Sequence, residues 1–433
     1  MLHDPSHYEP PAIAEPISLA DADKDMLRKL AEELAGIAAL PIHREKADLW
    51  RHLNDRQAVR PMVWINEIPW HEMDVDGELE LRCVHPFARD QERELRRTIY
   101  QWRHLQCDMI VNDFLSCPLA IHSTDFGIIE EVDIVRTDAV SEIVSRHFHK
   151  QIHDDADLEK IKMPVLTHNA QATEFRYQAM CDVYGDIMPV KKTGQAHIWF
   201  TPWDYLIRWW GIEDAMIDMV ERPDLVHTAV ERMVDAWLVE LDQFVALNAL
   251  ALDCNNTRIG SGGYGYVSDL PGRDFDASCV QPHNMWGCSN AQIFSEVSPK
   301  MHWEFALEHD LRWLRRWGLN YYGCCEPLDG KSDLLKRIPN LRKVSVTPWC
   351  KTERAVEMLG PHWVMSRKPN PAILAEDEWR PERARQDLRV FLEAARGCHL
   401  EIILKDISTV RRQPQRLWEW AHIAMEEAEA FAR

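Results

Sequence analysis

The chain has 433 residues, of which 46% are hydrophobic and 28% charged, and its formal net charge at pH 7 is -20. A chain of this length buries an ample core without disulfides or a structural metal. The negative charge repels phosphate backbones and anionic lipids, which argues against nucleic-acid and membrane partners. The 11 cysteines form no Cys-x-x-Cys pair, and residues 1–18 carry neither a basic start nor an apolar core. We therefore expect a cytoplasmic protein with reduced thiols.

Residues 1–40 are predicted to form an N-terminal arm and a helix. Prolines in the first 20 residues predict an irregular arm, and Ala, Leu, Lys and Glu at helical spacing over 22–38 predict the helix. A second helix is expected over 42–54. Residues 41–433 are expected to form one further domain.

Short apolar runs alternate with helical patterns through the rest of the chain. They begin near residues 61, 108, 190, 249, 320, 343, 363 and 400. A long helix is predicted over 299–317, and an irregular insertion follows the second run. This alternation predicts parallel strands covered by helices, and eight units favour an α/β fold of the closed (β/α)8 TIM-barrel type. A doubly wound sheet is the alternative, but it would show a glycine-rich turn where this chain has residues 66–70, Asn-Glu-Ile-Pro-Trp.

Polar side chains follow nearly every predicted strand. In a barrel, catalytic groups lie at these carboxyl ends, so an enzyme site is the natural explanation. The candidates in chain order are Glu67, Asn112, His197, Asn256, Tyr322, Cys324, Cys325, Glu326, Arg367, Lys405 and Asp406.

The last third of the chain resembles the uroporphyrinogen decarboxylase superfamily. Residues 343–374 read as a strand, a helix ending in Leu359-Gly360, and a strand closing on an Asn370-Pro371 turn and Leu374. One branch of this superfamily decarboxylates uroporphyrinogen without a cofactor. The other consists of zinc-dependent methyltransferases that exchange methyl groups among small donors, corrinoid proteins and thiols.

The chain departs from both branches at their signatures. The decarboxylases carry Arg-Gln-Ala-Gly-Arg after the first strand, whereas this chain has the acidic Glu67, which would oppose a polycarboxylate. The methyltransferases place His-x-Cys after the fifth strand, where Cys324 matches the cysteine and Tyr322 replaces the histidine. Their second cysteine corresponds to Lys405-Asp406. The resemblance thus implies an uncharacterised branch that does not act on uroporphyrinogen.

A metal site is predicted around the adjacent cysteines. Thiolates are soft ligands for Zn2+, and a nearby histidine or carboxylate would complete the set. The predicted ligands are Cys324, Cys325, Glu326 and His283, the last from a loop with Cys-x3-His-x4-Cys spacing. One buried cysteine with an incidental neighbour is the structural alternative.

Four residues are predicted to be catalytic: Glu67, His197, Cys324 and Asp406. A carboxylate at the mouth of an apolar cleft can have a raised pKa and hold a proton. Five residues are predicted to bind substrate: Asn112, Asn256, Tyr322, Arg367 and Lys405. The alternatives are a helix cap for Glu67 and a salt-bridge network for Arg367 and Lys405. The glycine-rich segment 260–265 is read as a mobile loop over the site.

These expectations combine into one functional hypothesis. We expect a methyltransferase that passes a methyl group from a small methoxylated or methylated compound to a corrinoid carrier protein or a thiol, assisted by Zn2+. The first alternative is a cofactor-independent decarboxylase or lyase acting on a small carboxylic acid. The second is a non-catalytic binding subunit. Members of the superfamily often form dimers, so the resemblance implies a homodimer.

Overall fold

A parallel sheet forms the centre of the protein. The computed structural model describes residues 15–135 and 144–431, so most of the predicted N-terminal arm lies outside the described residues. All neighbouring strands of the six-stranded sheet are parallel. In hydrogen-bonding order they are β1 (Met62–Ile65), β12 (His399–Leu404), β11 (Val364–Arg367), β10 (Leu341–Val346), β9 (Leu319–Tyr322) and β8 (Trp286–Ser289). The predicted α/β class is confirmed.

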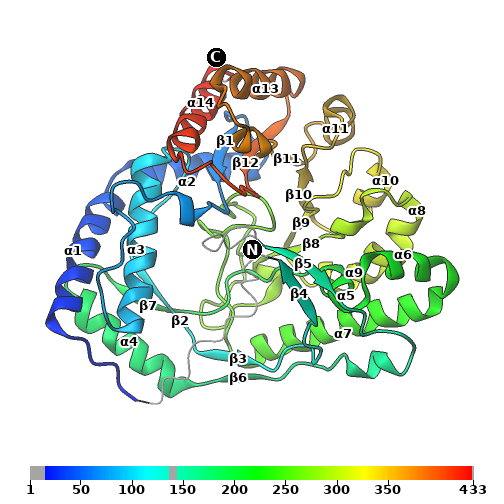
Figure 1. Cartoon of the computed structure of the whole chain (residues 1–433), viewed down its shortest axis with the longest axis horizontal. Helices are drawn as coiled ribbons and strands as arrows, with labels where there is room; N and C mark the ends of the chain where they lie inside the picture. The colour runs from blue at the N-terminus through cyan, green and yellow to red at the C-terminus, as the bar shows by residue number, and fades with distance from the viewer. Residues whose placement is uncertain (1–14, 136–143, 432–433) are drawn as a thin grey trace.

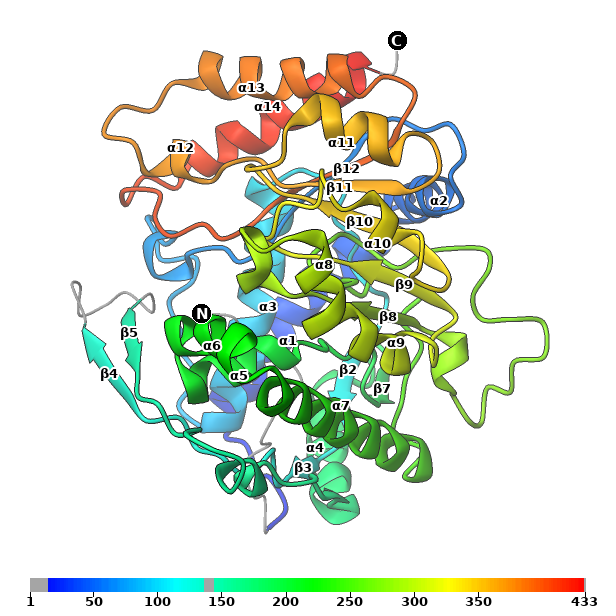
Figure 2. The same cartoon turned by 90° about the vertical axis from the view of Figure 1, so that its right-hand side faces the viewer.

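Helices cover one face of this sheet, which we call its outer face (Figure 1 and Figure 2). All six residues of β10 are buried, as expected for a parallel strand packed on both faces. The covering helices are α8 (Pro299–His302), α9 (Glu308–Leu314), α10 (Ser332–Leu335), α11 (Thr352–Leu359), α12 (Ala372–Ala375), α13 (Pro381–Ala394) and α14 (Gln415–Phe431). A π-helical turn over Trp303–Leu307 joins α8 to α9, so the predicted long helix forms over 299–314.

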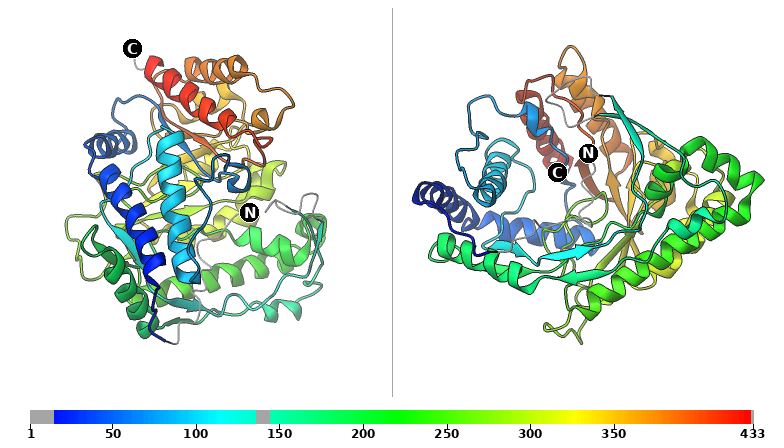
Figure 3. Two further views of the ribbon diagram at one scale, coloured as in Figure 1. Left: turned by 60° about the vertical axis from the view of Figure 1, so that its left-hand side comes forward. Right: turned by 60° about the horizontal axis from the view of Figure 1, so that its bottom comes forward.

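The first three helices flank the start of the sheet. They are α1 (Asp21–Ala38), α2 (Ile42–Asn54) and α3 (Pro86–His104). Figure 3 shows α1 and α3 side by side. Leu27, Leu30 and Leu34 of α1 share a buried cluster with Leu95 and Ile99 of α3. Because each set recurs at helical spacing, one stripe of each helix is buried. Residues on another stripe of α3 line a cavity that is described below.

The segment between α3 and β8 holds the remaining elements. Its helices are α4 (Ala170–Tyr184), α5 (Pro202–Trp210), α6 (Ile212–Glu221) and α7 (Pro223–Ala246). Its strands pair two by two: β2 (Leu115–Pro118) with β7 (Val190–Thr193), β3 (Ile121–Ser123) with β6 (Leu166–His168), and β4 (Val132–Val135) with β5 (Ser145–Phe148). Among the described helices, none combines the length and apolar character needed to cross a bilayer.

Two predicted strands are much reduced in the structure. Residues 108–112 lie beside β1 but form no strand, because the Asp108 carboxylate binds the Val63 N–H and the Arg60 guanidinium where a strand would continue its ladder. Residues 249–253 keep one bridge, between Leu250 and Gln195. Conversely, β8 was not predicted, since its sequence Trp-Gly-Cys-Ser has little strand character. A complete eight-stranded barrel stays a prediction.

The glycine-rich segment 260–265 packs on the inner face of the sheet. All six of its residues are buried. A Cβ atom on Gly260 would lie 2.4 Å from the Tyr321 ring, and one on Gly262 would lie 2.4 Å from the Glu401 carboxylate. The glycines are therefore needed for close approach of backbone to side chains. The prediction of a mobile loop is wrong.

Candidate functional site

Charged groups meet where β1 and β12 end. The Glu67 carboxylate lies 2.9 Å from the Arg258 guanidinium and 3.7 Å from the Lys405 ammonium, and it accepts the Asp406 N–H at 3.0 Å. The Lys405 ammonium also lies 2.6 Å from the Asp406 carboxylate. Glu67 and Asp406 both adopt a left-handed backbone, with φ of 53° and 56°. Such strain in non-glycine residues clusters at functional sites, which favours a functional role for this ionic cluster.

The pKa values of the two carboxylates of the cluster are shifted in opposite directions. Burial alone would raise the pKa of Glu67, but the charges of Arg258 and Lys405 lower it to about 2. Glu67 is therefore ionised near neutral pH, contrary to the expectation of a raised pKa. Burial raises the pKa of Asp406, with the charge of Glu67 acting in the same direction. Asp406 is the better proton donor of the two.

A pair of thiols lies beside this ionic cluster. Cys324 and Cys325 follow β9, their sulfur atoms are 3.6 Å apart, and the Lys405 ammonium is 4.0 Å from the Cys324 sulfur. A hydrogen bond from the Cys324 thiol lowers the pKa of Cys325, and the same bond, with burial, raises the pKa of Cys324 well above its usual range. Lys405 lowers the pKa of Cys325 further. Of the two thiols, the half-buried Cys325 is therefore the one that ionises more readily.

Backbone contacts hold the thiol pair in place. Gly323 adopts φ of 93°, which lets the chain turn at the end of β9. The Glu326 carboxylate accepts the N–H groups of Cys324 and Ala291 at 2.9 and 3.0 Å, and the Ser345 hydroxyl donates to the Cys324 carbonyl at 2.7 Å. Glu326 is fully buried, and burial raises its pKa. Its role is to position the turn.

The predicted zinc ligands are not brought together. Glu326 directs both oxygens to backbone N–H groups. His283 is exposed and precedes β8, whereas Cys324 and Cys325 follow β9. Because these strands are parallel, His283 lies at the opposite end of the sheet. Within the described residues no group of three or more His, Cys, Asp or Glu side chains could hold a metal ion. The residues present do not fit a four-ligand zinc site.

His197 lies in the core. Its Nε2 accepts the Gly260 N–H at 3.0 Å, and its Nδ1 lies 3.4 Å from the Asp253 carboxylate. Burial lowers the pKa of His197, but Cys288 and Asp253 outweigh burial and raise the pKa to about 10, which alone would favour a protonated ring. We assign the protonation state of His197 from its hydrogen bond with Gly260. That bond needs a lone pair on Nε2, so the ring is neutral and protonated at Nδ1. With both nitrogens engaged, His197 anchors the glycine-rich segment rather than acting as a base.

Two predicted substrate ligands face away from the inner side of the sheet. Tyr322 is fully buried and its hydroxyl lies 2.6 Å from Nε2 of His302 in α8. Arg367 donates to the Thr347 carbonyl at 2.7 Å and lies over the ring of Phe391 in α13. Both side chains are therefore on the outer, helix-covered face.

Their sequence neighbours occupy the inner face instead. The Lys368 ammonium donates to the Tyr321 hydroxyl at 2.5 Å and to the Ser366 hydroxyl at 2.8 Å. The Tyr321 hydroxyl lies 2.9 Å from that of Ser261. Burial lowers the pKa of Lys368 to about 7. Successive residues of a strand point to opposite faces of the sheet, so a prediction that is wrong by one residue selects a side chain on the wrong face. Tyr321 and Lys368 therefore take the places that were predicted for Tyr322 and Arg367.

The two asparagines proposed as substrate ligands lie at the edge of this region. Asn256 is half-buried and donates to the Ile110 carbonyl at 3.0 Å. Asn112 is also half-buried. Arg258, which sequence reasoning missed, lies two residues beyond Asn256 and holds Glu67. The sequence did offer a reason to select Arg258, because this residue follows the predicted strand at 249–253.

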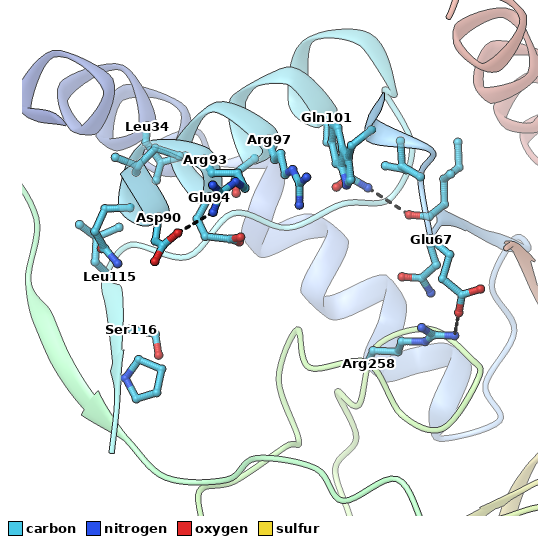
Figure 4. Close-up of a pocket in the computed structure, with 18 of the residues that line it drawn as sticks. Leu34, Glu67, Asp90, Arg93, Glu94, Arg97, Gln101, Leu115, Ser116 and Arg258 are labelled. Carbon is cyan, nitrogen blue, oxygen red and sulfur yellow. Dashed lines mark hydrogen bonds and ion pairs between the residues drawn. The ribbon is translucent and has the colours of Figure 1, made fainter. Parts of the chain in front are cut away.

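A large cavity opens beside the ionic cluster. It has a volume of about 1160 Å³ and lies between α3, the end of β1 and strand β2, and we call it the α3 cavity. Figure 4 shows Glu67 and Arg258 at one end, and Asp90 and Leu115 near the other. Glu67 thus touches both the α3 cavity and Lys405, which in turn reaches the thiols.

Comparison with known proteins gives a likeness of fold. No protein-family profile matches the chain, and no curated protein sequence matches it. Solved structures do match: a methyltransferase from Methanosarcina mazei has a TM-score of 0.51 and 11% sequence identity, over 90% of this chain and 99% of that one. The likeness extends over nearly the whole of both chains. At this identity it shows that the protein shares the fold of that methyltransferase.

Proposed function

We propose that this protein is an enzyme that transfers methyl groups, with Cys325 as the thiolate that accepts the methyl group from a small donor. One observation carries the proposal: a thiol pair with a positive charge 4.0 Å from one sulfur, at the carboxyl end of the sheet. The shared fold with a methyltransferase supports it. The proposal includes a closed barrel, completed by the β2–β7 pair and the bridge between Gln195 and Leu250.

The proposed reaction is an in-line displacement. The Cys325 sulfur attacks the methyl carbon, a carbon–sulfur bond forms, and the bond from the methyl group to its oxygen, nitrogen or sulfur atom breaks. That atom keeps the electron pair and takes a proton from Asp406, whose raised pKa suits a donor. The Lys405 ammonium lies 2.6 Å from the Asp406 carboxylate and 4.0 Å from the sulfur of Cys324, the neighbour of Cys325, so it keeps the acid and the thiol pair close together. In a second displacement the acceptor, another thiolate or the corrinoid of a carrier protein, would bond to the methyl carbon while the carbon–sulfur bond to Cys325 breaks and Cys325 leaves as the thiolate.

Zinc has no part in this scheme. The four predicted ligands do not converge, so every step is assigned to the chain's own side chains. A thiolate is a good nucleophile without a metal when a hydrogen bond and a cation lower its pKa. Both conditions hold at Cys325.

Turnover of single cysteine variants tests the proposal. Cys325→Ser is expected to lose methyl transfer by about 10³-fold or more, because a hydroxyl is not ionised near neutral pH. Cys324→Ser is expected to lose less, about tenfold to 100-fold, because a hydroxyl still donates to the Cys325 sulfur. Methyl release from labelled donors is the measurement. Equal activity in Cys325→Ser and the unaltered protein would refute the assignment.

A second candidate function is a metal-independent decarboxylase or lyase. The observation that favours it is Lys368, a buried amine with a pKa near 7 beside the Tyr321 hydroxyl. Such an amine can hold or release a proton as a carbanion forms. Release of carbon dioxide that persists in Cys325→Ser and is lost in Lys368→Met would favour this candidate over methyl transfer.

A further inference from the structure

The thiol pair after β9 has the geometry of a dithiol that can be oxidised to a disulfide. The sulfur atoms of Cys324 and Cys325 lie 3.6 Å apart and are joined by a hydrogen bond. All 11 cysteines of the chain lie among the described residues and none of them is bridged, so the structure shows the pair in its reduced form. Closing the pair requires only that the two sulfur atoms approach to a bond length of about 2.05 Å.

The two thiols differ in exposure and in reactivity. Cys324 is only 2% exposed, whereas Cys325 is half-buried and can meet a small molecule from solvent. Cys325 also ionises more readily, because Cys324 donates a hydrogen bond to its sulfur and the charge of Lys405 lowers its pKa further. An accessible, reactive thiol beside a protected one is typical of redox-sensitive sites, in which the second thiol captures the oxidised form of the first.

Oxidation of Cys325 would in turn activate Cys324. The largest cause that raises the pKa of Cys324 is its hydrogen bond to the Cys325 sulfur, followed by burial, and the charge of Lys405 acts in the opposite direction. A sulfenic acid on Cys325 carries no negative charge, so that hydrogen bond weakens. The Lys405 ammonium, 4.0 Å from the Cys324 sulfur, then favours a thiolate on Cys324. The buried thiol therefore becomes a nucleophile once its neighbour has been oxidised.

The backbone around the thiol pair allows this closure. Strand β9 ends at Tyr322, so both cysteines lie outside strands and helices, and no strand pairing has to break. Adjacent Cα atoms are about 3.8 Å apart, whereas disulfides usually join Cα atoms that are about 4.4–6.8 Å apart. A bridge between neighbours is therefore strained and is readily reduced by a dithiol, which suits a reversible modification.

We propose that Cys324 and Cys325 form a reversible oxidation site for peroxides, which closes as a disulfide between the two adjacent residues. With hydrogen peroxide, the Cys325 thiolate attacks one oxygen, a sulfur–oxygen bond forms, the oxygen–oxygen bond breaks, and the leaving hydroxide takes a proton to become water. The Cys324 sulfur then attacks the sulfur of the sulfenic acid. A sulfur–sulfur bond forms, and the hydroxyl group leaves with the Cys324 proton as a second water. The two thiols are oxidised and one peroxide is reduced.

Oxidation of the full chain with hydrogen peroxide tests the site. Trypsin releases both cysteines on one peptide, residues 317–331, which contains no other cysteine. After peroxide and alkylation in denaturant, this peptide is expected to be two hydrogen atoms lighter than the reduced peptide and to carry no alkyl group. Treatment with dithiothreitol before alkylation should restore two alkyl groups.

Cys398 provides the internal control for this measurement. It is also half-buried, but burial raises its pKa, so it should be oxidised about tenfold more slowly or less. A peptide that still takes two alkyl groups by the time Cys398 is oxidised would overturn the proposal. A sulfinic acid on Cys325 with Cys324 still alkylated would overturn it as well.

Serine variants separate the roles of the two thiols. In Cys324→Ser the sulfenic acid has no partner, so Cys325 is expected to react with dimedone, a sulfenic-acid trap, and then to form a sulfinic acid that dithiothreitol does not reverse. In Cys325→Ser, the buried Cys324 should stay reduced. Cys398→Ser should form the bridge as the unaltered protein does. Equal dimedone labelling of Cys325 in Cys324→Ser and in the unaltered protein would show that Cys324 captures nothing, which would overturn the proposal.

Formation of the bridge does not depend on the proposed function, but its effect on activity does. A bridged Cys325 has no thiolate to accept a methyl group, so methyl transfer should fall in proportion to the bridged fraction and recover with dithiothreitol. A bridge that forms while methyl transfer continues at the unaltered rate would refute Cys325 as the acceptor and leave the oxidation site standing. Methyl transfer that needs Cys325, in a protein whose thiol pair never bridges, would refute the oxidation site alone.

Discussion

Single residues at the carboxyl end of the sheet decide the chemistry. Cys324 and Cys325 are adjacent in sequence, yet the hydrogen bond between them separates their roles. The pKa of Cys324 is raised and that of Cys325 is lowered, so Cys325 ionises more readily. Glu67 and Asp406 divide in the same way, because Glu67 faces two cations and Asp406 faces Glu67. Pairs of like groups with opposite shifts are typical of acid–base sites.

The pH dependence of alkylation tests the thiolate assignment. A thiol reacts with iodoacetamide as its thiolate, so its rate rises with pH through its pKa. Because the pKa of Cys325 is lowered, its reaction should reach half its maximal rate below pH 9. Cys254 is also half-buried, but burial raises its pKa to about 11, so it provides the internal comparison. Peptide mass spectrometry of samples alkylated at each pH gives both curves.

Removing the positive charge of Lys405 should shift the pH dependence of Cys325 alkylation. Lys405→Met is expected to shift the Cys325 curve to higher pH, since Lys405 lowers the pKa of Cys325, and to leave the Cys254 curve in place. If the Cys325 curve in the unaltered protein lies at or above the Cys254 curve, the thiolate assignment is wrong.

The turn before the thiols is sensitive to a single methyl group. At Gly323 the φ is +93°, and an added Cβ would lie 2.6 Å from the Leu328 side chain. Gly323→Ala is expected to lower the free energy of unfolding by about 1–3 kcal/mol and to slow alkylation of Cys325, because the turn must shift. Gly272→Ala, where the Cβ would meet nothing within 4 Å, is the matched control. A Gly323→Ala protein as stable and as reactive as that control would show that the turn tolerates side chains.

At the scale of the elements, strands β10 and β12 are linked by a buried ion pair on the inner face. Lys343 lies 2.9 Å from Glu401, both side chains are fully buried, and Glu401 also accepts the Gly263 N–H at 3.0 Å. Lys343→Met leaves Glu401 buried and unpaired, so it should destabilise the protein by about 3–5 kcal/mol. Adding Glu401→Gln removes the charge but keeps an acceptor for Gly263. Urea unfolding should show that the double variant regains part of the loss, and a double variant less stable than Lys343→Met would contradict this account.

The order of the elements was largely predictable from the sequence. The face of the sheet on which each side chain lies was not. Apolar runs located β1, β9, β10, β11 and β12, because strands buried on both faces have long apolar sequences. That same property removes the alternation that would tell which face a residue occupies. The substrate candidates Tyr322 and Arg367 were therefore each one residue away from the inner-face Tyr321 and Lys368.

Other misses arose from contacts that have no local sequence signal. The short β8 is fixed by its neighbour β9, and the glycine-rich segment by Tyr321 and Glu401, which lie far along the chain. The zinc set failed because His283 and Cys325 lie at opposite ends of the sheet, and spacing alone does not give the end of a strand. The cluster of Glu67, Cys324, Lys405 and Asp406 was predicted, since carboxyl ends of parallel strands meet at one edge.

At the scale of the whole molecule, the parallel sheet collects side chains from distant segments at one edge. Glu67, Arg258, Cys325 and Lys405 come from four different parts of the chain, and the α3 cavity opens beside them. The fold is shared with a methyltransferase, while the local groups differ from a zinc site. These features together support thiol-based methyl transfer.

The most direct measurement is the mass of Cys325 after incubation with donors that carry a trideuterated methyl group. The account predicts one labelled methyl group on the peptide containing Cys325, lost in Cys325→Ser and retained in Cys398→Ser, which alters another half-buried cysteine away from the site. The donors should include 4-methoxybenzoate, methylamines and methyl thioethers. Labelled product released while Cys325 never carries the label, even when the reaction is stopped within one turnover, would contradict the central claim.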